Sequence, residues 1–82
     1  MNLVQTIKFI YYSTKLTILY TCATNLDNAI NLHNTMEDTI KLLAVNNKLS
    51  TLNKHVLIAM NRELFYNKVD TILANNVKMA SK

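Results

Sequence analysis

The 82-residue sequence contains neither glycine nor proline. Glycine supplies the positive φ angles of tight turns and proline ends helices, so a chain without either has few places to reverse direction sharply. Architectures with several β-strands need many such turns. The double absence therefore favours long helices joined by one or two loops.

The absence of glycine also excludes a group of catalytic motifs. A P-loop, a dinucleotide-binding fingerprint and a nucleophile elbow all need glycine at fixed positions. Cysteine is nearly absent as well, since Cys22 is the only one. An internal disulfide and a cysteine-rich zinc site are therefore excluded. We expect Cys22 to be a small buried hydrophobic residue.

Histidine and acidic residues are few, and their spacing does not indicate a reactive site. In a helical hairpin that turns near residues 48–50, His33 lies opposite Leu64 and His55 lies opposite Leu42. These levels are about 13 Å apart along a helix, too far for the two histidines to share a metal ion. We therefore interpret His33, which lies on an apolar stripe, as a partly buried histidine hydrogen-bonded to a neighbour.

The same register brings Asp27 level with Asp70, the only plausible carboxylate pair for acid–base chemistry. Acids in such positions are more often solvated residues near helix ends. We therefore expect no catalytic residue, no cofactor and no metal, so the chain is predicted not to be an enzyme.

What the chain does have is hydrophobic residues, which make up 50% of it, arranged at helical spacing. The clearest predicted helix covers residues 25–46. Thr24 is its expected N-cap, with Asp27 three residues later as in a capping box. Glu37 precedes Lys41 by four residues, the favourable orientation for an ion pair on one helix face. The apolar positions are Leu26, Ala29, Ile30, Met36, Ile40, Leu43 and Ala44, with His33 among them.

A second helix is predicted over residues 51–79. Asn46 or Asn47 is suited to the left-handed position that ends the preceding helix, and Ser50 or Thr51 to the cap of the next. The apolar residues of this helix fall on two sides, so it is expected to contact neighbours in two directions. One side carries Leu57, Met60 and Leu64, and the other carries Ile58, Phe65, Val69, Ile72 and Leu73.

The N-terminal segment admits four interpretations: a pair of strands, a targeting segment, a membrane anchor, or the first helix of a bundle. Lys8 and Lys15 argue against a membrane span, because each costs roughly 2.5–3.5 kcal/mol near the bilayer centre. A bundle helix explains most, because an apolar stripe recurs at helical spacing. Its members are Phe9, Tyr12, Leu16, Leu19 and Ala23.

Together these patterns predict an all-α fold: a helical hairpin of residues 25–46 and 51–79 with an N-terminal helix, forming a small three-helix bundle. Residues 1–82 are expected to be a single domain. The predicted function is that of a non-catalytic structural or adaptor subunit that engages a protein partner, or itself, through apolar helix faces. The candidate interface residues are Phe9, Tyr12, Leu16, Ile58, Phe65, Val69, Ile72 and Leu73.

Two other functions remain open. The net charge is +4, and residues 42–82 supply all of it, which suggests a small basic protein associated with nucleic acid. Its basic side chains are spread around the last helix rather than along one side, which disfavours a DNA-reading helix. They are Lys48, Lys54, Arg62, Lys68, Lys78 and Lys82. The third function is a membrane-associated subunit anchored by residues 3–23.

Overall fold

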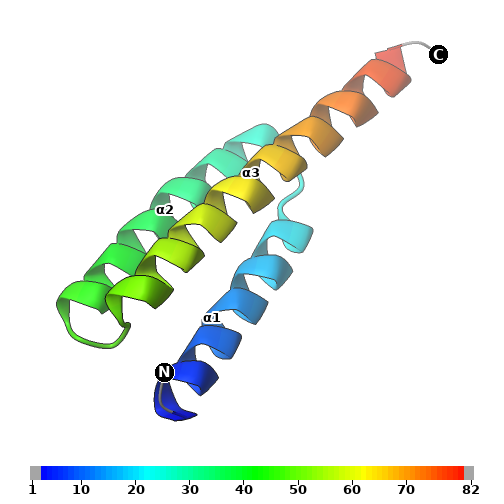
Figure 1. The fold of residues 1–82 in the computed structure, drawn as a ribbon. Helices are drawn as coiled ribbons and strands as arrows, with labels where there is room; N and C mark the ends of the chain where they lie inside the picture. The colour runs from blue at the N-terminus through cyan, green and yellow to red at the C-terminus, as the bar shows by residue number, and fades with distance from the viewer. Residues whose placement is uncertain (1–2, 81–82) are drawn as a thin grey trace.

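A computed structural model describes residues 3–80, and side chains within residues 3–78. It contains three helices, α1 (Leu3–Cys22), α2 (Leu26–Val45) and α3 (Thr51–Ala80), and no strand in this part of the chain. The helices pack side by side and alternate in direction (Figure 1). The predicted all-α, three-helix architecture is confirmed, and the strand interpretation of the N-terminal segment is wrong. Residues 1–2 and 81–82, among them Lys82, lie outside the described residues.

α1 is helical although it is rich in threonine, a residue whose hydroxyl competes with helix formation. Within α1 the hydroxyls of Thr17 and Thr21 donate to carbonyls four residues earlier, at 3.0 Å and 2.9 Å. Its predicted stripe faces the bundle, with Leu16 and Ala23 buried. Phe9, Tyr12 and Leu19 pack against the core from the same side.

The start of α2 corrects one prediction. Asn25, not Thr24, is the N-cap: its backbone is extended and its side chain accepts from the Asn28 backbone N–H at 2.8 Å. The Thr24 hydroxyl oxygen instead accepts from the Asn28 side-chain amide at 3.2 Å. The helix therefore begins one residue later than predicted, and Asp27 still lies in its first turn, where a carboxylate is favourable.

The connection between α2 and α3 follows the predicted chemistry. Asn47 takes the left-handed conformation, with φ of 59°. The Lys48 N–H then reaches back to the Leu43 carbonyl at 2.8 Å, which satisfies a carbonyl in the last turn of α2. Ser50 caps α3 by accepting the Asn53 N–H at 3.1 Å. A left-handed Asn thus reverses the chain where other proteins use glycine.

The core lies between all three helices. α3 contacts both neighbours, so its two predicted apolar sides are covered where α1 and α2 lie beside it, whereas Leu73 is 49% exposed. The buried core side chains are Leu16, Tyr20, Met36, Ile40, Leu49 and Leu57, and Ile58, Met60, Leu64 and Phe65 of α3 pack against them.

Cys22 was predicted to be buried, and this is wrong because its side chain is exposed. It lies outside the stripe that includes Leu19 and Ala23, on the last turn of α1. A small apolar residue that falls off a helical stripe turns toward solvent whatever its average preference for burial.

α3 is longer than its neighbours. Near the end of α1, the Lys68 ammonium group donates to the Thr21 carbonyl at 3.4 Å. Beyond this level α3 continues alone, as the orange and red ribbon of Figure 1 shows. We call residues 71–80 the overhang. It accounts for the elongated shape of the molecule, whose Cα atoms extend over 52 × 19 × 16 Å.

Candidate functional site

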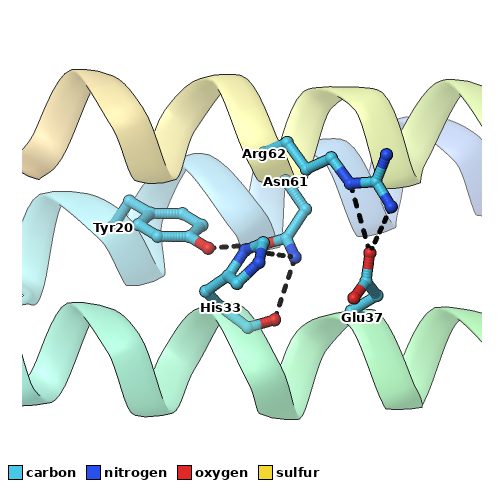
Figure 2. Close-up of polar contacts among 5 residues, drawn as sticks. All are labelled: Tyr20, His33, Glu37, Asn61 and Arg62. Carbon is cyan, nitrogen blue, oxygen red and sulfur yellow. Dashed lines mark hydrogen bonds and ion pairs between the residues drawn. The ribbon is translucent and has the colours of Figure 1, made fainter.

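One residue from each helix meets in a polar cluster inside the bundle (Figure 2). The Tyr20 hydroxyl of α1 donates to the Asn61 side-chain oxygen of α3 at 2.6 Å. The Asn61 amide nitrogen donates to the His33 backbone carbonyl of α2 at 3.0 Å and lies 3.4 Å from His33 Nδ1. Asn61 is fully buried and Tyr20 is only 3% exposed. The cluster therefore links the three helices at one level.

Phe65 stacks on the His33 ring, with ring centroids 4.5 Å apart and an angle of 24° between the planes. His33 is therefore the partly buried, hydrogen-bonded histidine that its place on the apolar stripe predicts. The predicted hairpin register places His33 opposite Leu64. Its neighbours in the structure, Asn61 and Phe65, lie on either side of Leu64 in the sequence, so this register is found.

Burial changes the acidity of Tyr20. Loss of hydration disfavours the phenolate, and the nearby Glu37 carboxylate disfavours it further, so the pKa of Tyr20 rises from 10.0 to about 12. At neutral pH the hydroxyl is protonated and donates to Asn61. The raised pKa keeps Tyr20 a hydrogen-bond donor to a higher pH than an exposed tyrosine.

Beside this cluster, Arg62 of α3 forms an ion pair with Glu37 of α2 at 3.0 Å. The Arg62 hydrogen bond is the main cause that lowers the pKa of Glu37, and the charge of Lys41 adds to it. The sequence pattern pairs Glu37 with Lys41, whereas the direct contact in the structure is made by Arg62. This pair links α2 to α3 one turn from the buried cluster (Figure 2).

A second set of polar contacts joins α1 to α3 at the other end of α1. The Gln5 side-chain oxygen accepts from the Ser50 N–H at 3.2 Å, and the Gln5 backbone carbonyl accepts from the Asn53 amide at 3.4 Å. Asn53 is 1% exposed. Buried asparagines of α3, Asn53 and Asn61, thus fix the position of α1 along α3 at two levels.

These polar clusters join the helices to one another. The Cys22 side chain lies apart from them: it is exposed, whereas Tyr20 and Asn61 are buried. Within residues 3–78, no three His, Cys, Asp or Glu side chains gather closely enough to hold a metal ion. A surface hollow of about 420 Å³ is lined by α1 alone, and Tyr11, Lys15 and Ile18 are among its walls.

The predicted interface residues divide into two groups. Leu16 is fully buried, so no partner reaches it in the folded bundle. Phe9, Tyr12, Ile58 and Phe65 are partly buried against the same core. Toward the overhang, Val69 and Ile72 are partly buried, and Leu73 is 49% exposed. The structure therefore brings the first group together in the bundle interior and leaves the second on the far part of α3.

Asn53 and Asn61 were missed by the search for apolar stripes, because asparagine is not counted as apolar. A signal was present: Asn53, Leu57 and Asn61 recur every four residues, so they share one helix face.

The fold defines the class of the protein as a small three-helix bundle with alternating helix directions and an extended last helix. No family model matches the chain, and neither the curated proteins nor the solved structures compared with it give a match. Among the described helices, none has the length and apolar character needed to cross a membrane.

Proposed function

We propose that this chain is a non-catalytic structural or adaptor subunit that binds a helix of a protein partner, or of a second copy of itself, through the far part of α3. The observation that carries the proposal is the overhang. It gives α3 about 15 Å of helix beyond its neighbours, at 1.5 Å per residue.

The overhang has a side suited to a partner helix. Leu73 and Val77 of the overhang and Val69 just before it are four residues apart and form one stripe, and Ile72 lies beside it. Leu73 is 49% exposed and Val77 is 66% exposed. An amphipathic helix laid along this stripe would cover it with anchors at the usual helical spacing.

Energetics favour a covered overhang. A free helix of ten residues is marginal in water, because most helical stability in proteins comes from packing an apolar face. Here the preceding turns of α3 nucleate the helix, but the overhang adds few contacts of its own. A partner helix would supply them.

Sedimentation velocity over roughly 1–100 µM tests the proposal. We expect the isolated protein to associate as its concentration rises, and Leu73→Gln with Val77→Gln to shift it to monomer. Glutamine keeps a high helix propensity, so the variant alters the surface rather than the helix. Leu52→Gln is the matched control, since Leu52 is 66% exposed at the opposite end of α3.

A wild-type protein that stays monomeric at the highest concentration and melts in one cooperative step would contradict an obligate partner. Equal loss of association in Leu52→Gln would contradict the assignment of the interface to the overhang.

A further inference from the structure

The end of the bundle opposite the overhang combines exposed aliphatic side chains with lysines. This loop end consists of residues 3–8 at the start of α1 and residues 41–56 around the α2–α3 connection, and it lies at the lower left of Figure 1. The hydrogen bonds from Ser50 and Asn53 to Gln5 hold the two segments together.

The aliphatic side chains of the loop end are highly exposed. Val45 is 76% exposed and Leu3 is 74% exposed, the two largest values among the exposed large hydrophobic residues of the described chain. The full set, with exposures from 42% to 76%, is Leu3, Val4, Ile7, Leu42, Val45, Leu52 and Val56. They come from all three helices, so the surface is a property of the bundle end rather than of one helix.

The charge of the loop end has one sign. Its two segments contain four lysines and no acid, giving a formal charge of +4. The five acids of the chain lie between residues 27 and 38 and between residues 63 and 70. The two acids nearest the loop end are Glu37 and Asp38. Glu37 is paired with Arg62, and Asp38 lies one turn before Lys41. The four lysines are Lys8, Lys41, Lys48 and Lys54.

We propose that the loop end binds the surface of an anionic lipid bilayer. The aliphatic side chains would enter the boundary between headgroups and acyl chains, and the lysines would lie among the anionic headgroups. Leu16 and Tyr20 stay buried in this arrangement, so the bundle remains folded. An anchor made of residues 3–23 would instead withdraw these side chains from the core.

The composition of the surface favours lipid over nucleic acid. RNA and DNA backbones contact cationic and polar groups. Exposed aliphatic side chains such as Val45 and Leu52 would gain no contact from such a backbone. Arginine, which suits phosphate recognition in nucleic acids, is absent from the loop end, and Arg62 is already paired with Glu37.

The arrangement of the surface suits lipid. Seven exposed aliphatic side chains and four lysines are spread over two segments that come from all three helices. A bilayer accepts such a scattered set, because each inserted side chain and each lysine contributes separately.

Co-sedimentation of the full chain with lipid vesicles tests the proposal. We expect binding to phosphatidylcholine vesicles that contain about one third phosphatidylglycerol, weaker binding as salt rises from about 0.1 M to about 0.5 M, and little binding to phosphatidylcholine alone. Lys48→Gln with Lys54→Gln should weaken binding about 25-fold, at about fivefold per lysine. Val45→Gln with Leu52→Gln should also weaken binding at constant charge.

Matched variants outside both the loop end and the overhang provide the control. Lys15→Gln and Ile18→Gln change the same residue types on the exposed side of α1, where Ile18 is 57% exposed, and binding to the anionic vesicles should be unchanged within twofold. Circular dichroism checks that each variant is helical. Loss of binding in these controls, or no binding of the wild type at about 0.1 M salt, overturns the proposal.

A short RNA distinguishes the alternative. The lipid proposal is wrong if the protein binds RNA more tightly than the anionic vesicles and if Val45→Gln with Leu52→Gln changes neither RNA binding nor vesicle binding. The loop end would then be a nucleic-acid surface. An environment-sensitive dye gives an independent readout in a Cys22→Ser background. The dye should shift to the blue with vesicles when attached at Leu42→Cys, and not at Ile18→Cys, since Ile18 is 57% exposed and lies outside both the loop end and the overhang.

Discussion

Residues 51–70 and residues 71–80 belong to the same helix but have opposite surroundings. In the first part Leu57 and Asn61 are fully buried between α1 and α2. In the overhang Leu73 and Val77 are 49% and 66% exposed. Neither region contains glycine or proline. The difference shows that the neighbours of a helix, more than its own composition, decide which of its apolar residues stabilise the fold.

The largest expected difference between these regions is in core stability. Leu57→Ala should lower the free energy of unfolding by about 2–5 kcal/mol, because it removes buried methyl groups and leaves a cavity. Leu73→Ala should change it by less than about 0.5 kcal/mol in dilute solution, as for other surface substitutions. Urea denaturation measures both. Equal effects would mean that the overhang is packed as tightly as the bundle.

The second effect is a loss of stability at high pH that depends on the buried cluster. The folded pKa of Tyr20, about 12, is above its ordinary value of 10.0. Its contribution is therefore complete below pH 10 and is lost as the pH rises toward 12. The two-unit shift corresponds to about 3 kcal/mol. Urea denaturation of the wild type and of Tyr20→Phe, near pH 10 and near pH 12, measures this loss of stability. The part that depends on Tyr20 should be absent from the variant.

Near neutral pH the same variant tests the hydrogen bond itself. Tyr20→Phe leaves the buried Asn61 oxygen without its donor, and we expect a loss of about 1–3 kcal/mol. Tyr66→Phe is the control, because Tyr66 is 63% exposed, and it should change the stability by less than about 0.5 kcal/mol. A neutral result for Tyr20→Phe would show that another donor, such as water, replaces the tyrosine.

The smallest effect is expected at the exposed edge of the bundle. Arg62 lowers the pKa of Glu37, so this pair stabilises the fold at neutral pH and ceases to do so as acid protonates the carboxylate. Glu37→Gln should lower the melting temperature less than Tyr20→Phe does, and should reduce the dependence of that temperature on acidic pH. If Glu37→Gln leaves the dependence of the melting temperature on acidic pH unchanged, that dependence comes from other carboxylates.

The sequence predicts the helices better than it predicts their polar contacts. The absence of glycine and proline and the apolar stripes indicate the three helices, and Asn47 and Ser50 mark the connection correctly. These signals are local, so one sequence contains them. The N-cap was misplaced by one residue because Thr24 and Asn25 are both good caps, and only the backbone geometry decides between them.

The buried cluster could not be predicted because it depends on three helices at once. Asn61 is a polar residue on a helix, and only the position of Tyr20 on another helix makes it a buried acceptor. Cys22 failed for a different reason: the apolar stripe of its own helix already leaves it on the outside, and the general preference of cysteine for burial does not take that position into account.

The position of α1 has a consequence during protein synthesis. α1 packs more extensively on α3 than on α2, and its buried tyrosine bonds to Asn61, 41 residues later in the chain. At ribosomal rates of about 5–20 residues per second, roughly 2–8 s pass between the synthesis of these two residues. During that interval α2 is completed but α3, the main partner of α1, is not. The apolar side of the nascent α1 is therefore open to chaperones until α3 emerges.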